Sequence, residues 1–134
     1  MPIEFRYRLE PGAASQPIYR PVAKATLIGP NGKELSQYFY IDSGADFTII
    51  PYRVGLYLGL ESKGRAVFEV QGINGAVGII YATLQLILGD TKIDAKVGWA
   101  QLEHVPLLLG RTDIFDHFNV TFLQSKGLIL FDKA

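Results

Sequence analysis

The chain has 134 residues, of which 49% are hydrophobic, and its 13 basic residues balance its 13 acidic residues to a formal charge of zero. This length and composition fit one domain with a substantial hydrophobic core and exclude a largely disordered chain. Without a basic excess, nucleic acids and anionic membranes are not expected partners, and without cysteine the chain has no disulfide, thiolate metal site or cysteine nucleophile.

The N-terminal residues 1–20 combine charge with glycine and proline, and we expect them to form an arm with at most a short strand. Residues 21–134 are expected to form the one folded domain. The first residues contain no apolar segment of signal-peptide length, and no apolar run reaches the length that spans a bilayer. We therefore expect a soluble, cytoplasmic protein.

Residues 21–50 predict a hairpin followed by a short strand. Residues 21–28 are rich in apolar side chains and predict the first strand, and residues 33–41 predict its antiparallel partner. Between them, Gly29-Pro30-Asn31-Gly32 is a strong turn signal, because Asn-Gly suits the positive φ angles of a tight hairpin. Residues 48–50 predict a further short strand after a loop.

The rest of the chain predicts short strands separated by glycine turns, together with short helices. Pro51 can open a helix that ends near Gly59, and residues 111–119 are the best helical segment, with Thr112 as a candidate cap. Strands are expected at residues 65–70, 79–88, 93–100, 105–109, 120–123 and 128–131. This pattern indicates an all-β domain, either a barrel or a sandwich.

The most unusual stretch is Tyr38 to Ile50, where an aromatic and β-branched run leads into Asp42-Ser43-Gly44. The ordinary explanation of Asp42 is a turn former or a cap. However, this carboxylate directly follows a strongly apolar strand, and a charge beside a core costs free energy unless it is paired or hydrogen-bonded. Asp42 is therefore the first candidate for a functional residue.

Several other kinds of site find no support in the sequence. The glycine-rich residues 72–78 lack the spacing of a dinucleotide-binding loop, and no phosphate-binding loop is present. His104 and His117 are not at ligand spacing, so we expect structural or surface roles for them and no metal site. Ser43 lacks the Gly-x-Ser-x-Gly context of a serine hydrolase.

The residues from Asp42 to Ile50 resemble the active-site signature of the retropepsins, the single-domain aspartic proteases of retroviruses and their cellular and bacterial relatives. Two further matches follow in the same order. Gly72-Ile73-Asn74-Gly75 resembles the glycine-rich tip of the family's flap hairpin, and Leu107-Leu108-Leu109-Gly110-Arg111 resembles the segment before its C-terminal helix. The resemblance covers residues 22–131 and implies an acid-protease barrel with one short C-terminal helix.

This resemblance implies the chemistry of an aspartic endopeptidase, which needs no metal or cofactor. Two carboxylates about 3 Å apart share one proton, since like charges that close cannot both ionise. One activates a water as general base, and the protonated one polarises the scissile carbonyl. Because the chain carries one Asp-Ser-Gly, the resemblance implies a homodimer in which Asp42 pairs with Asp42 of a second copy and cleaves a peptide or protein.

The resemblance also implies roles for neighbouring residues. Support of the active-site loop is implied for Ser43, Gly44 and Thr48. Contact with the substrate is implied for Ala45, Asp46, Gly72, Ile73 and Leu108. Arg111 is the implied partner of Asp46, and the glycine-rich hairpin around Ile73 is the implied lid that excludes water.

Two readings compete with an active dimer. One is a binding or dimerisation module that keeps the fold without catalysis, since a fold does not guarantee activity. The other is a precursor whose N-terminal arm covers the cleft until it is removed. The arm and the hairpin at residues 120–131 exceed the minimal retroviral pattern, in which interleaved terminal strands build the dimer. The sequence thus leaves open how two subunits would meet.

Overall fold

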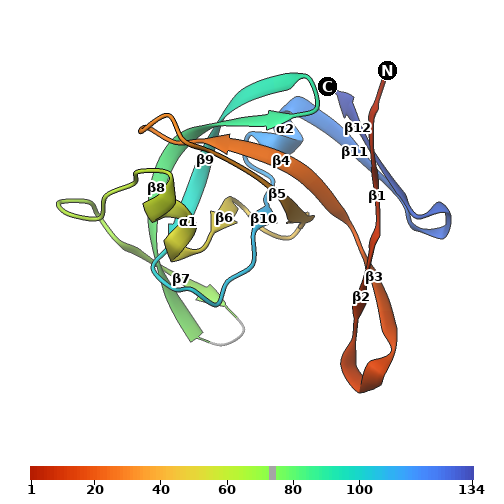
Figure 1. Ribbon diagram of the computed structural model, residues 1–134, viewed down its shortest axis with the longest axis horizontal. Helices are drawn as coiled ribbons and strands as arrows, with labels where there is room; N and C mark the ends of the chain where they lie inside the picture. The colour runs from red at the N-terminus through yellow and green to blue at the C-terminus, as the bar shows by residue number, and fades with distance from the viewer. Residues whose placement is uncertain (73–74) are drawn as a thin grey trace.

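The chain folds into three β-sheets (Figure 1). The structure, a computed structural model, describes residues 1–72 and 75–134. The largest sheet has seven strands: β4 (Val22–Ile28), β5 (Glu34–Ile41), β6 (Thr48–Ile50), β7 (Phe68–Gly72), β8 (Gly75–Leu88), β9 (Thr91–Ala100) and β10 (Leu108–Leu109). A three-stranded sheet contains β1 (Ile3–Arg6), β11 (Phe118–Leu123) and β12 (Leu128–Lys133). The third sheet is a hairpin of β2 (Arg8–Pro11) and β3 (Pro17–Arg20).

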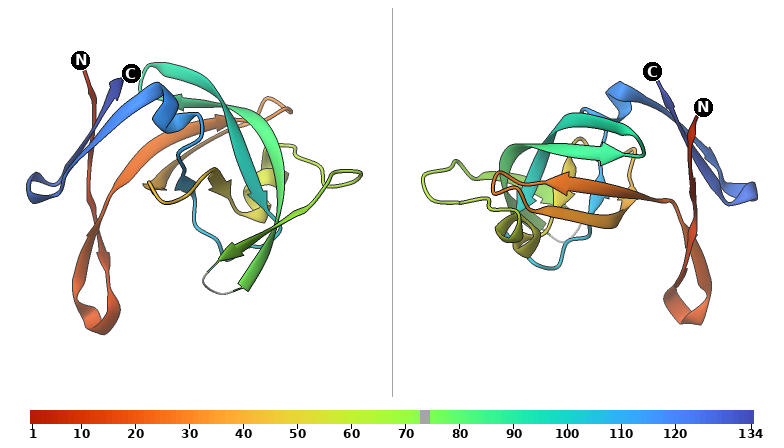
Figure 2. Two further views of the ribbon diagram at one scale, coloured as in Figure 1. Left: turned by 180° about the vertical axis from the view of Figure 1, so that it is seen from behind. Right: turned by 45° about the horizontal axis from the view of Figure 1, so that its top comes forward.

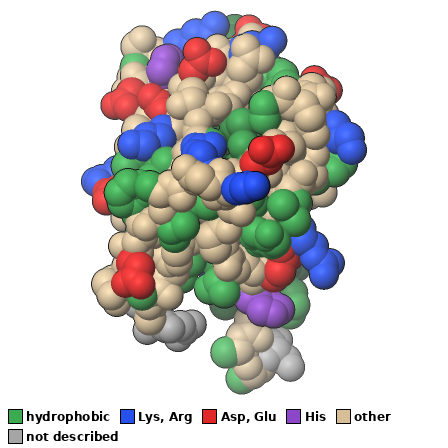
Figure 3. Space-filling model, turned by 90° about the vertical axis from the view of Figure 1, so that its left-hand side faces the viewer, with side chains coloured by type: hydrophobic (Ala, Val, Ile, Leu, Met, Phe, Trp, Pro, Cys, Tyr) green, Lys and Arg blue, Asp and Glu red, His purple; other side chains and the backbone are tan. Residues whose placement is uncertain are grey.

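The helices are short and fill connections between strands. They are α1 (Tyr52–Tyr57), α2 (Ile114–His117) and the 3-10 turns η1 (Ala13–Ser15) and η2 (Gln124–Lys126). In the part of the chain that the structure describes, no helix is long and apolar enough to cross a membrane. Side chains of both charge signs are interspersed with hydrophobic ones on the face seen in Figure 3, which agrees with the balanced composition.

The seven-stranded sheet closes on itself as a barrel. Its strand order is β4-β5-β10-β6-β9-β8-β7, and β4 also pairs antiparallel with β8. The turn between β4 and β5 has the hydrogen bond from the Gly32 N–H to the Gly29 carbonyl (2.9 Å), and Gly32 takes the positive φ of 82°. The predicted hairpin and the place of its turn are therefore confirmed, although Gly32 takes a positive φ and Asn31 does not. Closure leaves β7 as the strand that extends beyond the barrel, as the left view of Figure 2 makes clear.

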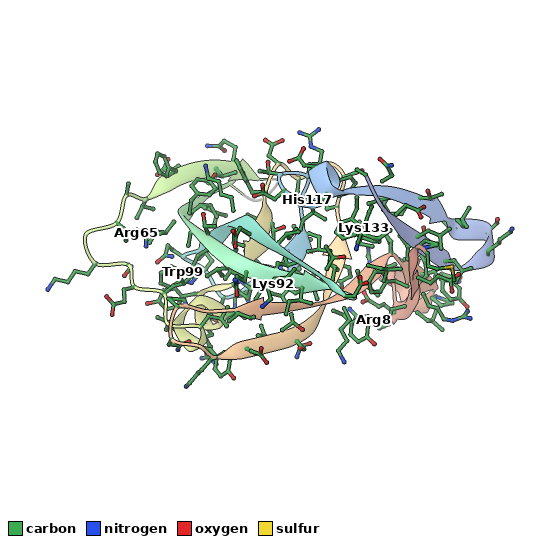
Figure 4. The ribbon with its side chains drawn as sticks, turned by 90° about the horizontal axis from the view of Figure 1, so that it is seen from above. Arg8, Arg65, Lys92, Trp99, His117 and Lys133 are labelled. Atoms are coloured by element: carbon green, nitrogen blue, oxygen red, sulfur yellow. The ribbon has the colours of Figure 1, made fainter. Side chains whose placement is uncertain are left out.

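The core lies inside this barrel and is built from large apolar side chains. Trp99, Phe39 and Leu27 are fully buried, and Trp99 occupies the interior in Figure 4. The indole Nε1 of Trp99 donates to the Tyr52 carbonyl (2.9 Å), and the two rings stack with centroids 5.4 Å apart. These contacts fix helix α1 to strand β9. They require glycine at position 55, because a Cβ there would lie only 2.2 Å from Nε1 of Trp99.

The sequence-based prediction for residues 1–20 was wrong, because these residues form three strands rather than an arm with at most one. Strand β1 pairs antiparallel with β12, with Phe5 opposite Ile129 and Ile3 opposite Phe131. The Phe5 and Phe131 rings meet edge to face at 5.3 Å. The partner strand lies at the other end of the chain, so local sequence does not reveal this pairing.

The C-terminal half follows the prediction with three corrections. The expected strand at 105–109 is limited to Leu108–Leu109, and the expected strand at 65–70 begins only at Phe68. The helix expected at 111–119 is limited to Ile114–His117, and its cap is Asp113, not Thr112. Asp113 and Asp116 form a reciprocal capping box, in which the side chain of each residue accepts a hydrogen bond from the backbone N–H of the other residue. The strands predicted at 79–88, 93–100, 120–123 and 128–131 are confirmed.

Candidate active site

Asp42 lies where strand β5 meets strand β10. Strand β10 runs parallel to β5 on one side and antiparallel to β6 on the other, so it joins the two strands that flank the Asp42 loop. The Asp42 N–H donates to the Leu109 carbonyl (3.0 Å), which continues the pairing of Ile41 with Leu109 one residue beyond β5. This places the half-buried Asp42 at the edge of the core.

The loop after Asp42 folds back onto the carboxylate. The Gly44 N–H donates to Asp42 Oδ1 (2.9 Å), and the Ala45 N–H donates to the Asp42 carbonyl (3.2 Å). These two bonds make a tight turn around the side chain, as Asp often does. A Cβ at Gly44 would lie 3.2 Å from Asp42 Oδ1, so glycine suits this approach. Ser43 and Gly44 are exposed at the tip of the loop, and Ala45 is half-buried.

Thr48 supports the loop from inside the protein. It is fully buried, and its hydroxyl oxygen Oγ1 accepts a hydrogen bond from the Gly110 N–H (3.2 Å). Gly110 itself has no room for a side chain, since a Cβ would lie 2.3 Å from the backbone carbon and oxygen of Phe47. The loop and the segment after β10 are therefore in direct backbone contact.

Asp46 and Arg111 complete this contact on the surface. Arg111 Nη2 lies 2.5 Å from Asp46 Oδ1, and the side chains are 57% and 70% exposed. The backbones also pair, because the Arg111 N–H donates to the Ala45 carbonyl (2.9 Å) and the Thr112 N–H donates to the Asp46 carbonyl (2.9 Å). The structure thus brings together the pair that the resemblance implied.

A pocket of about 470 Å³ opens beside Asp42. Leu108, Tyr40 and Pro106 line it together with Asp42, so the pocket offers apolar and aromatic surface as well as the carboxylate. Glu10 and Arg20 from the hairpin of β2 and β3 also line this pocket. Neither residue can be assigned to the pocket from the sequence, because only the fold of the N-terminal segment brings them there.

Glu10 lies at the centre of a hydrogen-bonded charge cluster beside this pocket. Its carboxylate accepts hydrogen bonds from the Tyr40 hydroxyl (2.8 Å) and from Arg8 Nη2 (2.7 Å), and a carboxylate oxygen lies 3.2 Å from Arg20 Nε. The hydrogen bond from Tyr40 is the main reason why the pKa of Glu10 lies below its ordinary value. Burial, the second largest effect, opposes this shift, and Arg8 and Arg20 lower the pKa further. Arg8 also lies over the Tyr40 ring at 5.6 Å.

The hairpin of β7 and β8 extends from the barrel next to the Asp42 loop. Gly72 is the last residue of β7 and pairs with Gly75, which has a φ of 107°. Ile73, the expected lid residue, lies outside the described residues. At the base of the hairpin, the Tyr81 ring packs against Phe47 (5.0 Å) and Phe68 (5.7 Å), which connects the hairpin to the residue after Asp46.

Neither a family model nor a curated protein matches the sequence. The structure, however, is similar to a retropepsin-like aspartic protease from Rickettsia conorii, with a TM-score of 0.65 at 15% identity, over 95% of this chain and 97% of the other. It is also similar to the EIAV protease solved with the inhibitor HBY-793, with a TM-score of 0.57 at 17% identity, over 78% of this chain and 91% of the other. The chain therefore has the retropepsin-like fold, and the predicted all-β barrel is confirmed.

Proposed function

We propose that the chain is an aspartic endopeptidase that forms its catalytic dyad from Asp42 of two copies. The observation that carries this proposal is the position of Asp42. It follows a core strand, its carboxylate is oriented by the Gly44 N–H at 2.9 Å, and it lines a pocket with Leu108. A retropepsin-like fold supplies the setting in which such a loop can meet its symmetry mate.

The proposed reaction is hydrolysis of a peptide bond by a water molecule held between the two carboxylates. The ionised Asp42 takes a proton from the water as its oxygen attacks the carbonyl carbon, and the protonated Asp42 donates its proton to the carbonyl oxygen. The tetrahedral intermediate then collapses: the C–N bond breaks, the Asp42 that took the proton from water gives it to the leaving nitrogen, and the other Asp42 takes back a proton from a hydroxyl of the intermediate, so that the dyad again holds one proton. The two apparent pKa values would belong to the pair of carboxylates and not to either one.

The surroundings of Asp42 suggest the substrate and the roles of the neighbouring residues. Leu108, Tyr40 and Pro106 form a wall that suits an apolar side chain of a peptide. We assign Ser43, at the exposed tip, to contact between the two Asp42 loops, and Ala45 and Asp46 to contact with the substrate. The hairpin that contains Gly72 and Ile73 would close over the peptide and exclude water.

The test is cleavage of a peptide mixture derived from an unfolded protein, monitored by mass spectrometry over a range of acidic to neutral pH. Asp42→Asn should lower the rate by about a hundredfold or more, because it removes the acid–base pair. The fold should survive, as judged by circular dichroism and by the fluorescence of Trp99. Asp94→Asn, which changes an exposed acid of β9, is the matched control and should cleave normally.

Cleavage by Asp42→Asn at the rate of the unmodified chain would contradict the proposal. An unmodified chain that cleaves no peptide, although it is folded and concentrated, would instead favour a catalytically silent binding module. Absence of cleavage alone does not decide how the chain associates, so association needs its own measurement.

A further inference from the structure

The hairpin of β2 and β3, here called the N-terminal hairpin, is attached to the barrel at its root and otherwise projects away from it. Its strands pair from Arg8 with Arg20 at the root to Pro11 with Pro17 near the tip. Figures 1 and 2 show it clear of the barrel in all three views. All four residues of β3 are exposed, so this strand has no covering layer. An isolated two-stranded hairpin is only marginally stable in water.

The two faces of the N-terminal hairpin differ in chemistry. Residues directly opposite each other in an antiparallel pair share a face, and alternate residues along a strand share it too. Leu9 lies opposite Tyr19, and Pro11 lies opposite Pro17. These four residues therefore form one face, the apolar face, and Leu9 and Tyr19 are 55% and 62% exposed on it. Such an exposed apolar surface is typical of a protein contact.

The opposite face of the N-terminal hairpin is mostly charged, with Ile18 as its apolar residue, and it fixes the root to the barrel. Arg8 and Glu10 lie on it, and Glu10 accepts the Tyr40 hydroxyl at 2.8 Å. The guanidinium of Arg8, which is labelled in Figure 4, also lies 5.6 Å from the centroids of the Tyr38 and Tyr40 rings. The direction in which the apolar face points is thus set by contacts within the chain, which gives it a defined orientation.

The root of the N-terminal hairpin lies on the surface where a second copy has to arrive. Glu10 and Arg20 line the same pocket as Asp42. If two Asp42 carboxylates approach to about 3 Å, the residues around each pocket come within reach of the other chain. A projecting element at this place has to lie alongside the second copy.

The C-terminal strand β12 offers no edge of its own to a second subunit. Strand β12 is the central strand of the three-stranded sheet, and β1 and β11 occupy its two edges. The C-terminal strand is therefore already paired on both sides within its own chain, and the outer edges of this sheet belong to β1 and β11. The hairpin offers in addition the apolar side chains of Leu9 and Tyr19, which stay exposed among the residues that the structure describes.

We propose that the apolar face of the N-terminal hairpin binds a second copy of this chain and so assembles the site around the two Asp42 residues. This inference rests on the proposed function, because the requirement for a second Asp42 identifies the partner. In a two-fold dimer each hairpin makes the same contact, so the apolar face is buried twice. Tyr19 is the expected main contributor, since tyrosine is enriched among the residues that dominate interfaces.

The test is sedimentation velocity over a range of protein concentrations. The unmodified chain should dimerise, and Leu9→Ser combined with Tyr19→Ser should raise the dissociation constant by about thirtyfold or more. Leu56→Ser is the matched control, because Leu56 is a leucine of α1 with a similar exposure of 48%. Cleavage per molecule should fall in the double variant at low concentration and recover at high concentration. In the unmodified chain, amide exchange at residues 8–20 should slow as the concentration rises.

A double variant that dimerises as well as the control would overturn this inference, and so would an unmodified chain that stays monomeric at every concentration. Faster cleavage by the double variant would also overturn it, because the hairpin would then be covering the cleft of its own chain. A dimer that depends on Leu9 and Tyr19 but cleaves nothing would support the contact and contradict the proposed function. The two failures are therefore distinguishable.

Discussion

The hydroxyl of Thr48 and the backbone N–H of Gly110 form a 3.2 Å hydrogen bond between the strand after the Asp42 loop and the segment after β10. Thr48 is fully buried, so its oxygen finds a donor inside the protein in the Gly110 N–H. Because β10 also accepts the Asp42 N–H, this bond helps to fix the position of the candidate catalytic residue.

Thr48→Val should destabilise the protein by about 1–3 kcal/mol, because it leaves the buried Gly110 N–H without an acceptor while the shape is kept. Chemical denaturation measures this change. Thr48→Ser is the control, since it keeps the oxygen and loses only a methyl group. The Gly110 amide should exchange faster with solvent in the valine variant than in the serine variant, and equal exchange in both would contradict the assigned hydrogen bond.

Gly110→Ala should be more harmful than a usual glycine-to-alanine change. The added Cβ would lie 2.3 Å from the carbonyl carbon and oxygen of Phe47, and backbone atoms cannot move aside as a flexible side chain can. We expect a loss of about 3 kcal/mol, near the upper end of overpacking costs. Thermal unfolding measures it. Gly64→Ala is the control: Gly64 has a φ of 74°, and a Cβ there would meet no other atom. Its loss of stability, which should be smaller, therefore measures the cost of backbone strain alone.

The sequence was most informative around Asp42, where local requirements determine the residue types. Gly44 must allow its backbone N–H to reach the carboxylate, and Gly110 must fit against Phe47. Both residues lie within the short segments that resemble the retropepsin pattern. The barrel could also be predicted, because its strands alternate strongly and its turns contain glycine.

The sequence was less informative where a distant partner decides the structure. Phe118 continues the apolar spacing of Ile114 and Phe115 and so predicts a longer helix. In the structure Phe118 instead begins β11 and pairs with Lys133, so sheet pairing overrides the local helical pattern. The positive φ of Asp113, 70°, was equally invisible, since residues other than glycine seldom take this conformation.

Glu10 and Arg20 were missed in the pocket for the same reason. Nothing in the segment 1–20 by itself indicates that it folds beside Asp42. The pairing of β2 with β3 and the hydrogen bond from Tyr40 to Glu10 are both needed to bring these charges there.

The ion pair between Asp46 and Arg111 should contribute little to stability despite its short distance of 2.5 Å. Both side chains are more than half exposed, and exposed pairs are typically worth about 0.2–1 kcal/mol. A double-mutant cycle with Asp46→Asn and Arg111→Gln measures the coupling. It should weaken further in high salt, because screening acts on exposed charges. A coupling above about 2 kcal/mol, or one insensitive to salt, would show that the backbone contacts of Ala45 and Asp46 depend on this pair.

Acid should loosen the root of the N-terminal hairpin through Glu10. The pKa of Glu10 is lowered in the folded chain, first by the Tyr40 hydroxyl and then by Arg8 and Arg20. A lowered folded pKa means that this carboxylate stabilises the fold above its unfolded pKa, and that the stabilisation is lost as the pH falls through the folded pKa.

The carboxyl carbon of Glu10, followed by NMR, should titrate below the ordinary range of glutamate. Tyr40→Phe should raise the pKa of Glu10, since it removes the largest cause of the shift, whereas Tyr57→Phe, a change to an exposed tyrosine of α1, should leave it unchanged. An unchanged titration of Glu10 in Tyr40→Phe would contradict the role assigned to this hydrogen bond and would place the anchor of the hairpin on the two arginines alone.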